Sequence, residues 1–250
     1  MSRVILRRVI THFKKQEWTA IALDFLIVVV GVFIGIQFSN WNELRHERAI
    51  EHEYLERLYA DMQQTLAAKP DRVTWNNDRK AQQAMVLHHL RTGVLPEEDR
   101  RAFEVGLAFF GFISGIDVDW ATVEELKSTG AMNIIRDVSL RSMILVKDSD
   151  LQRRQNIVEN FFQAIYGFRQ EIGGFYGIVE FTGERNDVVL NYDFEALAAN
   201  PAFINALSQI DFLSQFVSQF GERETEDLVE LRDELARQLG VDSSAGTRPD

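Results

Sequence analysis

The chain has 250 residues, with 27 basic and 38 acidic side chains, a formal net charge of −11 and no cysteine. The acidic surplus argues against a nucleic-acid partner, because such a partner binds to a basic surface. The lack of cysteine excludes disulfides, thiolate metal ligands and thiol nucleophiles.

Residues 1–18 carry the basic side chains that precede a long apolar run: Arg3, Arg7, Arg8, Lys14 and Lys15. Basic residues next to a membrane helix stay on its cytoplasmic side, so we expect this segment to be cytoplasmic. Its apolar residues favour either an amphipathic foot lying on anionic lipid or a simple charge cluster that sets the topology.

Residues 19–38 read TAIALDFLIVVVGVFIGIQF, and 13 of these 20 residues are Ile, Leu, Val or Phe. Twenty helical residues span about 30 Å, the thickness of a bilayer's hydrocarbon core. Inserting the apolar side chains contributes about −4 to −8 kcal/mol, and Trp18 and Trp41 bracket the run as interfacial residues do. We therefore predict one retained transmembrane helix. A buried helix of a soluble domain and a cleaved signal peptide are the alternatives.

The charges that follow the run predict the orientation. Only Arg45 and Arg48 lie close behind it, mixed with four glutamates. Residues 1–38 hold five basic and two acidic side chains, which leaves 22 basic and 36 acidic ones, a charge of −14, for the rest. The positive-inside rule places residues 39–240 outside the cytoplasm, and an acidic surface would stand off anionic lipid. About 200 residues suffice for one domain with a hydrophobic core.

Four residues within the run form a predicted helix–helix interface: Asp24, Gly31, Gly35 and Gln37. Glycines four residues apart lie on one helix face and allow two backbones to approach closely, as in a homodimer or a complex with another membrane protein. An ionisable residue in a membrane helix suggests a function. Asp24 either pairs with a partner helix or with Lys14 or Lys15, or it faces the cytoplasmic headgroups.

Directly after the run, Asn40, Trp41 and Asn42 form a polar collar at the outer rim of the membrane. Amides at this depth bind lipid headgroups, water or a neighbouring helix. The collar is therefore either an anchor that fixes the depth of the helix or a recognition surface.

The run Gly31–Glu43, GVFIGIQFSNWNE, resembles the GIxIAxQINNWNE-like signature of a family of uncharacterised bacterial single-pass membrane proteins. The element Tyr54-Leu55-Glu56-Arg57-Leu58 and the patch from Thr122 to Gly130, continuing to Leu140-Arg141, also resemble that family. The family often has Glu where this chain has Asp24, and Ala where it has Gly35. The resemblance implies the bacterial inner membrane, with the body in the periplasm, and it implies no reaction.

The rest of the chain has few prolines and many helical periods, so we predict an all-α fold, a helical bundle after a stalk helix at 41–68. Apolar residues recur every seven positions from Ile144 to Ile172, a heptad-like seam that Lys147 and Arg154 interrupt. Two glycines end this helix, and a short hairpin at 178–181 and 188–190 follows. The last predicted part is one helix or a helix pair around Gly221, with a disordered tail at 241–250.

A dense aromatic patch contains Phe109, Phe110, Phe112 and, farther on, Trp120. Such a patch is most often core, and a ligand pocket is the alternative. The five histidines lack metal-ligand spacing, and no nucleophile elbow, phosphate loop or dinucleotide fingerprint is present. We therefore expect no metal, no cofactor and no enzymatic activity.

Two functions agree with these features. The first is a membrane-anchored, non-catalytic interaction or scaffold protein with a periplasmic helical domain, which binds membrane lipid and a second copy or another protein. The second is a periplasmic ligand-sensing or substrate-binding domain on a membrane anchor.

Overall fold

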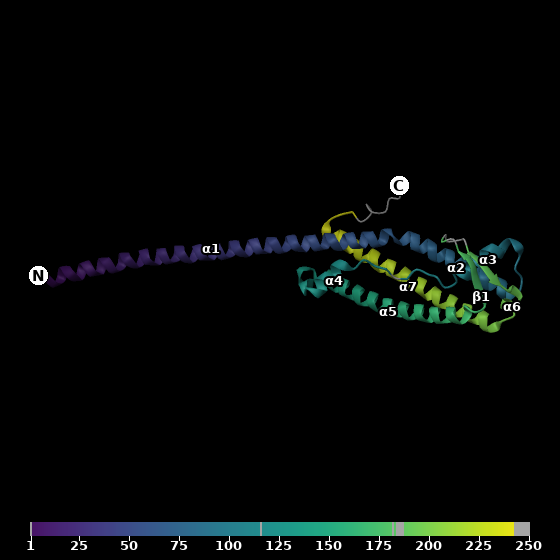
Figure 1. Cartoon of the computed structure of the whole chain (residues 1–250). Helices are drawn as coiled ribbons and strands as arrows, with labels where there is room; N and C mark the ends of the chain where they lie inside the picture. The colour runs from purple at the N-terminus through teal and green to yellow at the C-terminus, as the bar shows by residue number, and fades with distance from the viewer. Residues whose placement is uncertain (1, 116, 182, 184–187, 243–250) are drawn as a thin grey trace. The chain divides into compact units, whose positions relative to one another are not determined.

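The computed structural model describes residues 2–115, 117–181, 183 and 188–242, and side chains from residue 21 onward. The fold is predominantly helical with one small two-stranded sheet, so the predicted all-α class is confirmed (Figure 1). The elements in chain order are α1 (Ser2–Ala67), α2 (Lys69–Thr92), η1 (Glu97–Asp99), α3 (Arg100–Ala108), α4 (Ala121–Ser128), η2 (Ala131–Ile134), α5 (Val138–Ile172), β1 (Tyr176–Phe181), β2 (Val188–Tyr192), α6 (Phe194–Ala198) and α7 (Pro201–Leu239).

The chain divides into two units, Met1–Glu53 and Tyr54–Asp250. Helix α1 contributes to both, and it begins well before the predicted start of the membrane helix at Thr19. The first unit is this helix alone. The second unit holds the last turns of α1 together with all of the other elements.

A proline lies at the junction between α1 and α2. Pro70 lies in the first turn of α2, where its missing N–H costs no hydrogen bond. Gly93 ends α2 in the left-handed region, at φ 67°, and its N–H donates to the carbonyl of His89 at 2.9 Å.

Helices α5 and α7 run antiparallel and form the long axis of the second unit (Figure 1). The heptad residues of α5 predicted as a seam are all buried: Ile144, Leu151, Val158, Ile165 and Ile172. Asp137 caps α5 by accepting from Ser139 and Leu140, and Asn200 caps α7 before Pro201. Gly221 lies inside α7, so the last segment is one helix and not a pair.

Two large apolar clusters fill opposite ends of the bundle. One joins α1, α4, η2 and the facing ends of α5 and α7, with Leu58, Met62, Val123, Leu126, Ile144 and Leu231 fully buried. The other joins α2, α3, the hairpin and the far ends of α5 and α7, with Leu90, Phe103, Phe110, Ile172, Phe203 and Ile210 fully buried. A third, small cluster of Ile113, Val158 and Val217 lies on α5 and α7 and on the loop after α3.

An ion-pair cluster occupies the charged positions of the α5 seam. The Lys147 ammonium lies 2.5 Å from Asp227 of α7, and the Arg154 guanidinium lies 2.6 Å from the same carboxylate. Lys147 also pairs with Glu230. The two cations that interrupt the apolar repeat therefore bind α7 through acids that face them.

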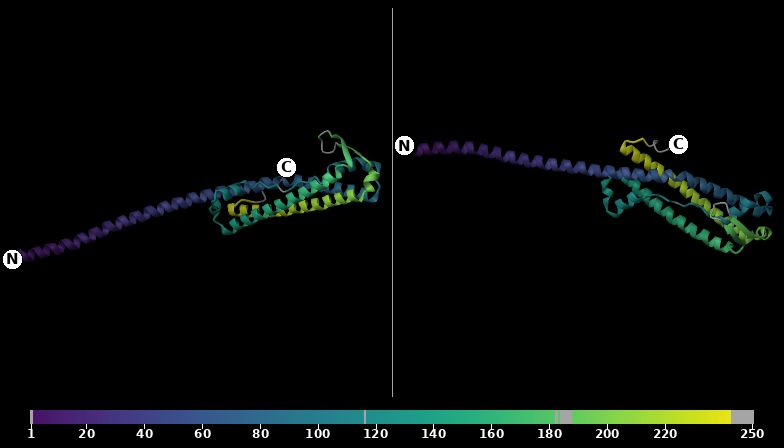
Figure 2. Two further views of the ribbon diagram at one scale, coloured as in Figure 1. Left: turned by 60° about the horizontal axis from the view of Figure 1, so that its bottom comes forward. Right: turned by 45° about the horizontal axis from the view of Figure 1, so that its top comes forward.

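The hairpin at 178–181 and 188–190 is confirmed. β1 and β2 pair antiparallel, from Tyr176 opposite Tyr192 to Phe181 opposite Val188, with a bulge between Ile178 and Glu180. The hairpin lies at the end of the bundle that also holds α3 and α6 (Figure 2). Residues 184–187 and the tail at 243–250 lie outside the described residues, so the predicted disorder of the tail stays a prediction.

Replacing Asp227 tests the ion-pair cluster. Burial opposes ionisation of this carboxyl, but hydrogen bonds from Lys147 and Arg154 outweigh it and hold its pKa below the ordinary 3.8. A depressed acid pKa stabilises the fold above 3.8, and this stability is lost as the pH falls through the lowered pKa. We expect Asp227→Asn to lower the free energy of unfolding at pH 7 by about 1–2 kcal/mol.

The measurement is urea unfolding of the detergent-solubilised full chain, followed by near-UV circular dichroism at pH 7 and below pH 3.8. The difference between wild type and Asp227→Asn should shrink at the lower pH. Asp233→Asn is the matched control, because Asp233 is half exposed and its ion pair is with its neighbour Arg232. Equal effects of the two variants would contradict this role for Asp227.

Candidate functional sites

The apolar segment of α1 is exposed throughout. All 13 Ile, Leu, Val and Phe side chains between Ile21 and Phe38 are exposed, for example 70% for Phe25. This is the one helix in the described part of the chain that is long and apolar enough to cross a membrane, and none of its most apolar window, of mean hydropathy 2.5, is buried. A core helix of a soluble domain would be covered, so the exposure argues against that alternative.

Helix geometry divides the predicted interface residues between two faces. Asp24, Gly31 and Gly35 are separated by seven and four residues, so they lie on one face of α1. Gln37 follows Gly35 by two residues, about 200° around the helix, and so lies on nearly the opposite side. An added Cβ would meet nothing at either glycine, so both are open to a second helix.

The predicted collar carries a short series of ring contacts. The ring of Trp41 lies 6.0 Å from that of Phe38, and the Arg45 guanidinium lies 4.9 Å above the Trp41 ring. Gln37 shares this face of the helix, since it precedes Trp41 by four residues. Asn40 and Asn42 are exposed. An amphipathic ring beside a cation and amides is typical of the interfacial zone of a bilayer.

Four polar residues of α1, spaced three or four apart, hold the start of α4. Tyr54 and Arg57 both donate to Glu125, the former at 2.8 Å. Asp61 accepts from the N–H of Thr122 at 3.2 Å, and Thr65 accepts from the N–H of Asp119 at 3.0 Å.

The first turn of α4 is therefore held in part by another helix. The helix begins at Ala121, and no side chain makes an N-cap hydrogen bond at Trp120. Asp119 still accepts from the N–H of Ala121, at 3.3 Å. Gly130 is left-handed after this helix, at φ 70°.

The same part of α1 packs its apolar residues beside these bonds. Leu55, Leu58 and Met62 belong to the cluster that also contains Val123 and Leu126 of α4. The Tyr54–Leu58 element and the patch from Thr122 to Gly130 were two of the segments that resemble the uncharacterised family. These two segments contact each other in the fold, which gives them a common structural role.

Trp120 lines a polar cavity of about 270 Å³. Its indole N–H donates to the buried carboxylate of Asp148 on α5 at 2.9 Å, and Lys127 lies 2.5 Å from the other oxygen of that carboxylate. Glu124 and Gln152 also line the cavity. Asp148 thus joins α4 to α5, and its role was not predicted because its partners lie 21 and 28 residues away.

The other predicted pocket residues lie elsewhere. Phe110 is fully buried in the cluster near the hairpin, so its side chain is core. Phe109 packs against the same cluster, and Phe112 lines an open apolar cleft of about 620 Å³. Trp120 belongs to the cluster at the opposite end of the bundle. The four aromatic residues therefore do not share one cavity.

Two buried or half-buried cations were missed in the sequence. Lys69 of α2 pairs with the buried Glu224 of α7, and burial raises the pKa of Glu224 while the ammonium opposes that rise. Arg169 of α5 lines the apolar cleft. The sequence around each of these cations resembles that around a solvent-exposed charged residue of a helix, so the local sequence does not predict their burial.

Comparisons with known proteins add no relative: no family model, no curated protein and no solved structure matches this chain. The family resemblance stays a prediction. Within the described residues, no group of three or more His, Asp or Glu side chains is arranged to hold a metal ion.

Replacing Asp148 tests the contact between α4 and α5. Asp148→Ala leaves the buried Trp120 N–H and the partly exposed Lys127 ammonium without their shared acceptor, which costs about 2–4 kcal/mol of unfolding free energy. Asp150→Ala is the control, because Asp150 is half exposed and pairs with Arg153 on its own helix; it is expected to stay within about 0.5 kcal/mol of wild type. Urea unfolding followed by tryptophan fluorescence measures both. A wild-type midpoint for Asp148→Ala would contradict the assigned role.

Proposed function

We propose that this chain is a single-pass membrane-anchored, non-catalytic interaction protein whose acidic helical body lies outside the cytoplasm, in the periplasm of a bacterium. The observation that carries the proposal is the exposed apolar segment Ile21–Phe38. Burying an apolar side chain stabilises by about 1.5–3 kcal/mol relative to leaving it in water. Thirteen such side chains on one helix therefore require a cover, and lipid supplies one of the right thickness.

The charge distribution supports the orientation. Five basic residues precede the segment and few follow it, which favours a cytoplasmic N-terminus. The segment is retained as an anchor in this proposal, because FSNW after the apolar run is a poor cleavage site for a signal peptide.

The partner that we propose is a second copy of the chain, docked through the face of α1 that carries Asp24, Gly31 and Gly35. Small residues let the two helix backbones approach, and interhelical hydrogen bonds in lipid then add to packing. Gln37 belongs to the opposite face in this arrangement. Together with Asn40, Trp41 and Asn42 it would set the depth of the helix.

A second candidate function is ligand sensing by the extracytoplasmic body. The specific observation in its favour is the apolar cleft of about 620 Å³ beside Phe112, within the size range of small-molecule sites.

The chain has no cysteine, so one introduced thiol reports on one helix face alone. Val28 lies on the same face as Asp24 and Gly31, whereas Phe33 lies about 180° away. In native membranes treated with a mild oxidant, we expect Val28→Cys to form a disulfide-linked dimer and Phe33→Cys to stay largely monomeric. The readout is non-reducing electrophoresis of the membrane fraction.

The dimer of Val28→Cys should decrease at least about ten-fold when Gly31→Ile and Gly35→Ile are added, because branched side chains keep the backbones apart. Val29→Ile in the same background is the control for added bulk, because Val29 lies about 130° around the helix from the centre of the proposed interface. Equal cross-linking at Val28 and Phe33, or a dimer unaffected by the two glycine replacements, would contradict the proposed interface.

A further inference from the structure

The apolar cleft lies beside α5 and the loop after α3, at the end of the bundle that holds the hairpin. Its lining is mostly apolar, with one cation: Gly111, Phe112, Ile113, Phe162, Gln163, Ile165, Tyr166 and Arg169. Gly111 is left-handed, at φ 82°, and an added Cβ would lie 2.6 Å from a methyl group of Ile210. The loop therefore packs closely against α7 at this glycine, and the adjacent Phe112 lines the cleft.

Arg169 is the chemical feature of this cleft. Its guanidinium donates to the carbonyl of Phe110, lies 3.5 Å from that of Ala108, and stacks 4.3 Å above the ring of Phe112. In the described part of the chain no carboxylate contacts it. Burial lowers the pKa of this guanidinium, and the neighbouring Tyr176 opposes that decrease. A half-buried cation without an anionic partner has donors left for a ligand, since a guanidinium carries five N–H groups.

The mouth of the cleft is aromatic. Tyr166 is 61% exposed and Phe112 is 48% exposed. The ring of Phe109 lies 5.8 Å from Phe112 and 6.1 Å from Phe181 of the hairpin, so three rings form a continuous row. Such exposed rings beside a cleft are typical of a surface that covers an apolar ligand group.

We propose that this cleft binds a small amphiphile with one anionic head, such as a carboxylate, which contacts Arg169 while the apolar part lies against Phe112, Phe162 and Tyr166. Arg169 favours a carboxylate head, because a planar guanidinium binds a carboxylate through paired hydrogen bonds. The inference deepens the ligand-sensing candidate and does not depend on the helix interface of α1. The ligand proposal and the proposed α1 interface can therefore be contradicted independently of each other.

The probe is 4-phenylbutyrate, titrated calorimetrically into the full-length protein in nanodiscs of phosphatidylcholine, with empty discs subtracted. We expect saturable binding of the acid. Binding at least about ten-fold weaker is expected for 4-phenylbutanol, which lacks the charge, and for acetate, which lacks the apolar group. Equal affinities of acid and alcohol would overturn the proposal, as would the lack of saturable binding.

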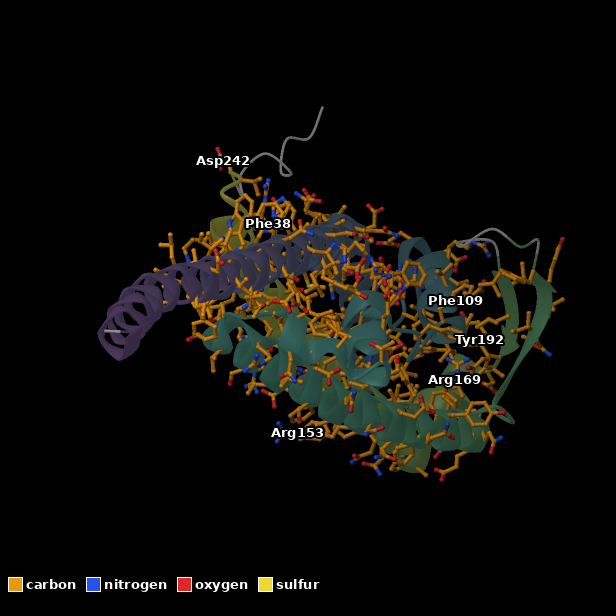
Figure 3. The ribbon with its side chains drawn as sticks, turned by 90° about the vertical axis from the view of Figure 1, so that its left-hand side faces the viewer. Phe38, Phe109, Arg153, Arg169, Tyr192 and Asp242 are labelled. Carbon is orange, nitrogen blue, oxygen red and sulfur yellow. The ribbon has the colours of Figure 1, made fainter. Side chains whose placement is uncertain are left out.

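Replacing two different arginines of α5 tests whether binding depends on Arg169 itself or only on the net charge of the protein. Figure 3 labels Arg169 and Phe109 on the side of the bundle nearer the hairpin, and Arg153, which comes earlier in α5, away from them. Arg169→Gln should weaken binding of the acid at least about ten-fold, Arg169→Lys less, and Arg153→Gln should leave it unchanged. Unchanged affinity in a folded Arg169→Gln protein would overturn the assignment.

Arg169 also bonds two carbonyls, so its replacement can unfold the chain, and Tyr166 provides an independent test. Tyr166→Glu places a carboxylate at the exposed rim, where it should repel the anion and weaken binding at least about five-fold. Tyr166→Phe should bind as wild type does. Equal binding by the two variants would overturn the proposal.

The anionic head could belong to a membrane lipid or to a free carboxylate, and a titration in discs that contain phosphatidylglycerol distinguishes the two. If the cleft takes an anionic lipid, phosphatidylglycerol should compete with 4-phenylbutyrate and weaken its binding. If the cleft takes a free carboxylate, the affinity for 4-phenylbutyrate should be the same in both kinds of disc.

Discussion

Leaving the apolar side chains of Ile21–Phe38 in water carries a large cost in free energy, and this cost is the main physical constraint on the chain. These residues form one helix, and no other described residue buries them. In the proposed arrangement a bilayer would cover the apolar side chains along their whole length, while the helix satisfies its own interior N–H groups. The basic residues before the segment and the acidic body after it would then lie on opposite sides of the membrane.

The body is organised by contacts between segments that are distant in sequence. The α5 and α7 pair supplies the seam, and Asp227 lies where two cations interrupt it. At one end, polar residues of α1 hold α4. At the other end, the hairpin, α3 and the loop with Gly111 surround the aromatic residues. The cleft with Arg169 lies between α5 and the loop after α3.

The sequence predicted the elements better than it predicted the sites. The seven-residue spacing from Ile144 to Ile172 identifies the buried face of α5 directly, and Pro70, Gly93 and Asn200-Pro201 mark helix ends because their backbone chemistry is local. The hydrogen bond from the N–H of Thr122 to Asp61 could not be predicted, since Asp61 lies on α1, 61 residues away in the sequence. Arg169 could not be predicted either, because only the fold places it beside Phe112 and away from any described carboxylate. Phe110 and Trp120 were grouped as one patch by sequence proximity, but they belong to different clusters.

The most direct test of the central claim is alkaline phosphatase fused to the C-terminus of the full-length chain, assayed in the membrane fraction of bacteria. The phosphatase folds to an active enzyme only outside the cytoplasm. The account predicts an active fusion of full-length size that stays in the membrane pellet after alkaline washing. An inactive fusion, or an active fusion that is shortened and released into the soluble fraction, would contradict it.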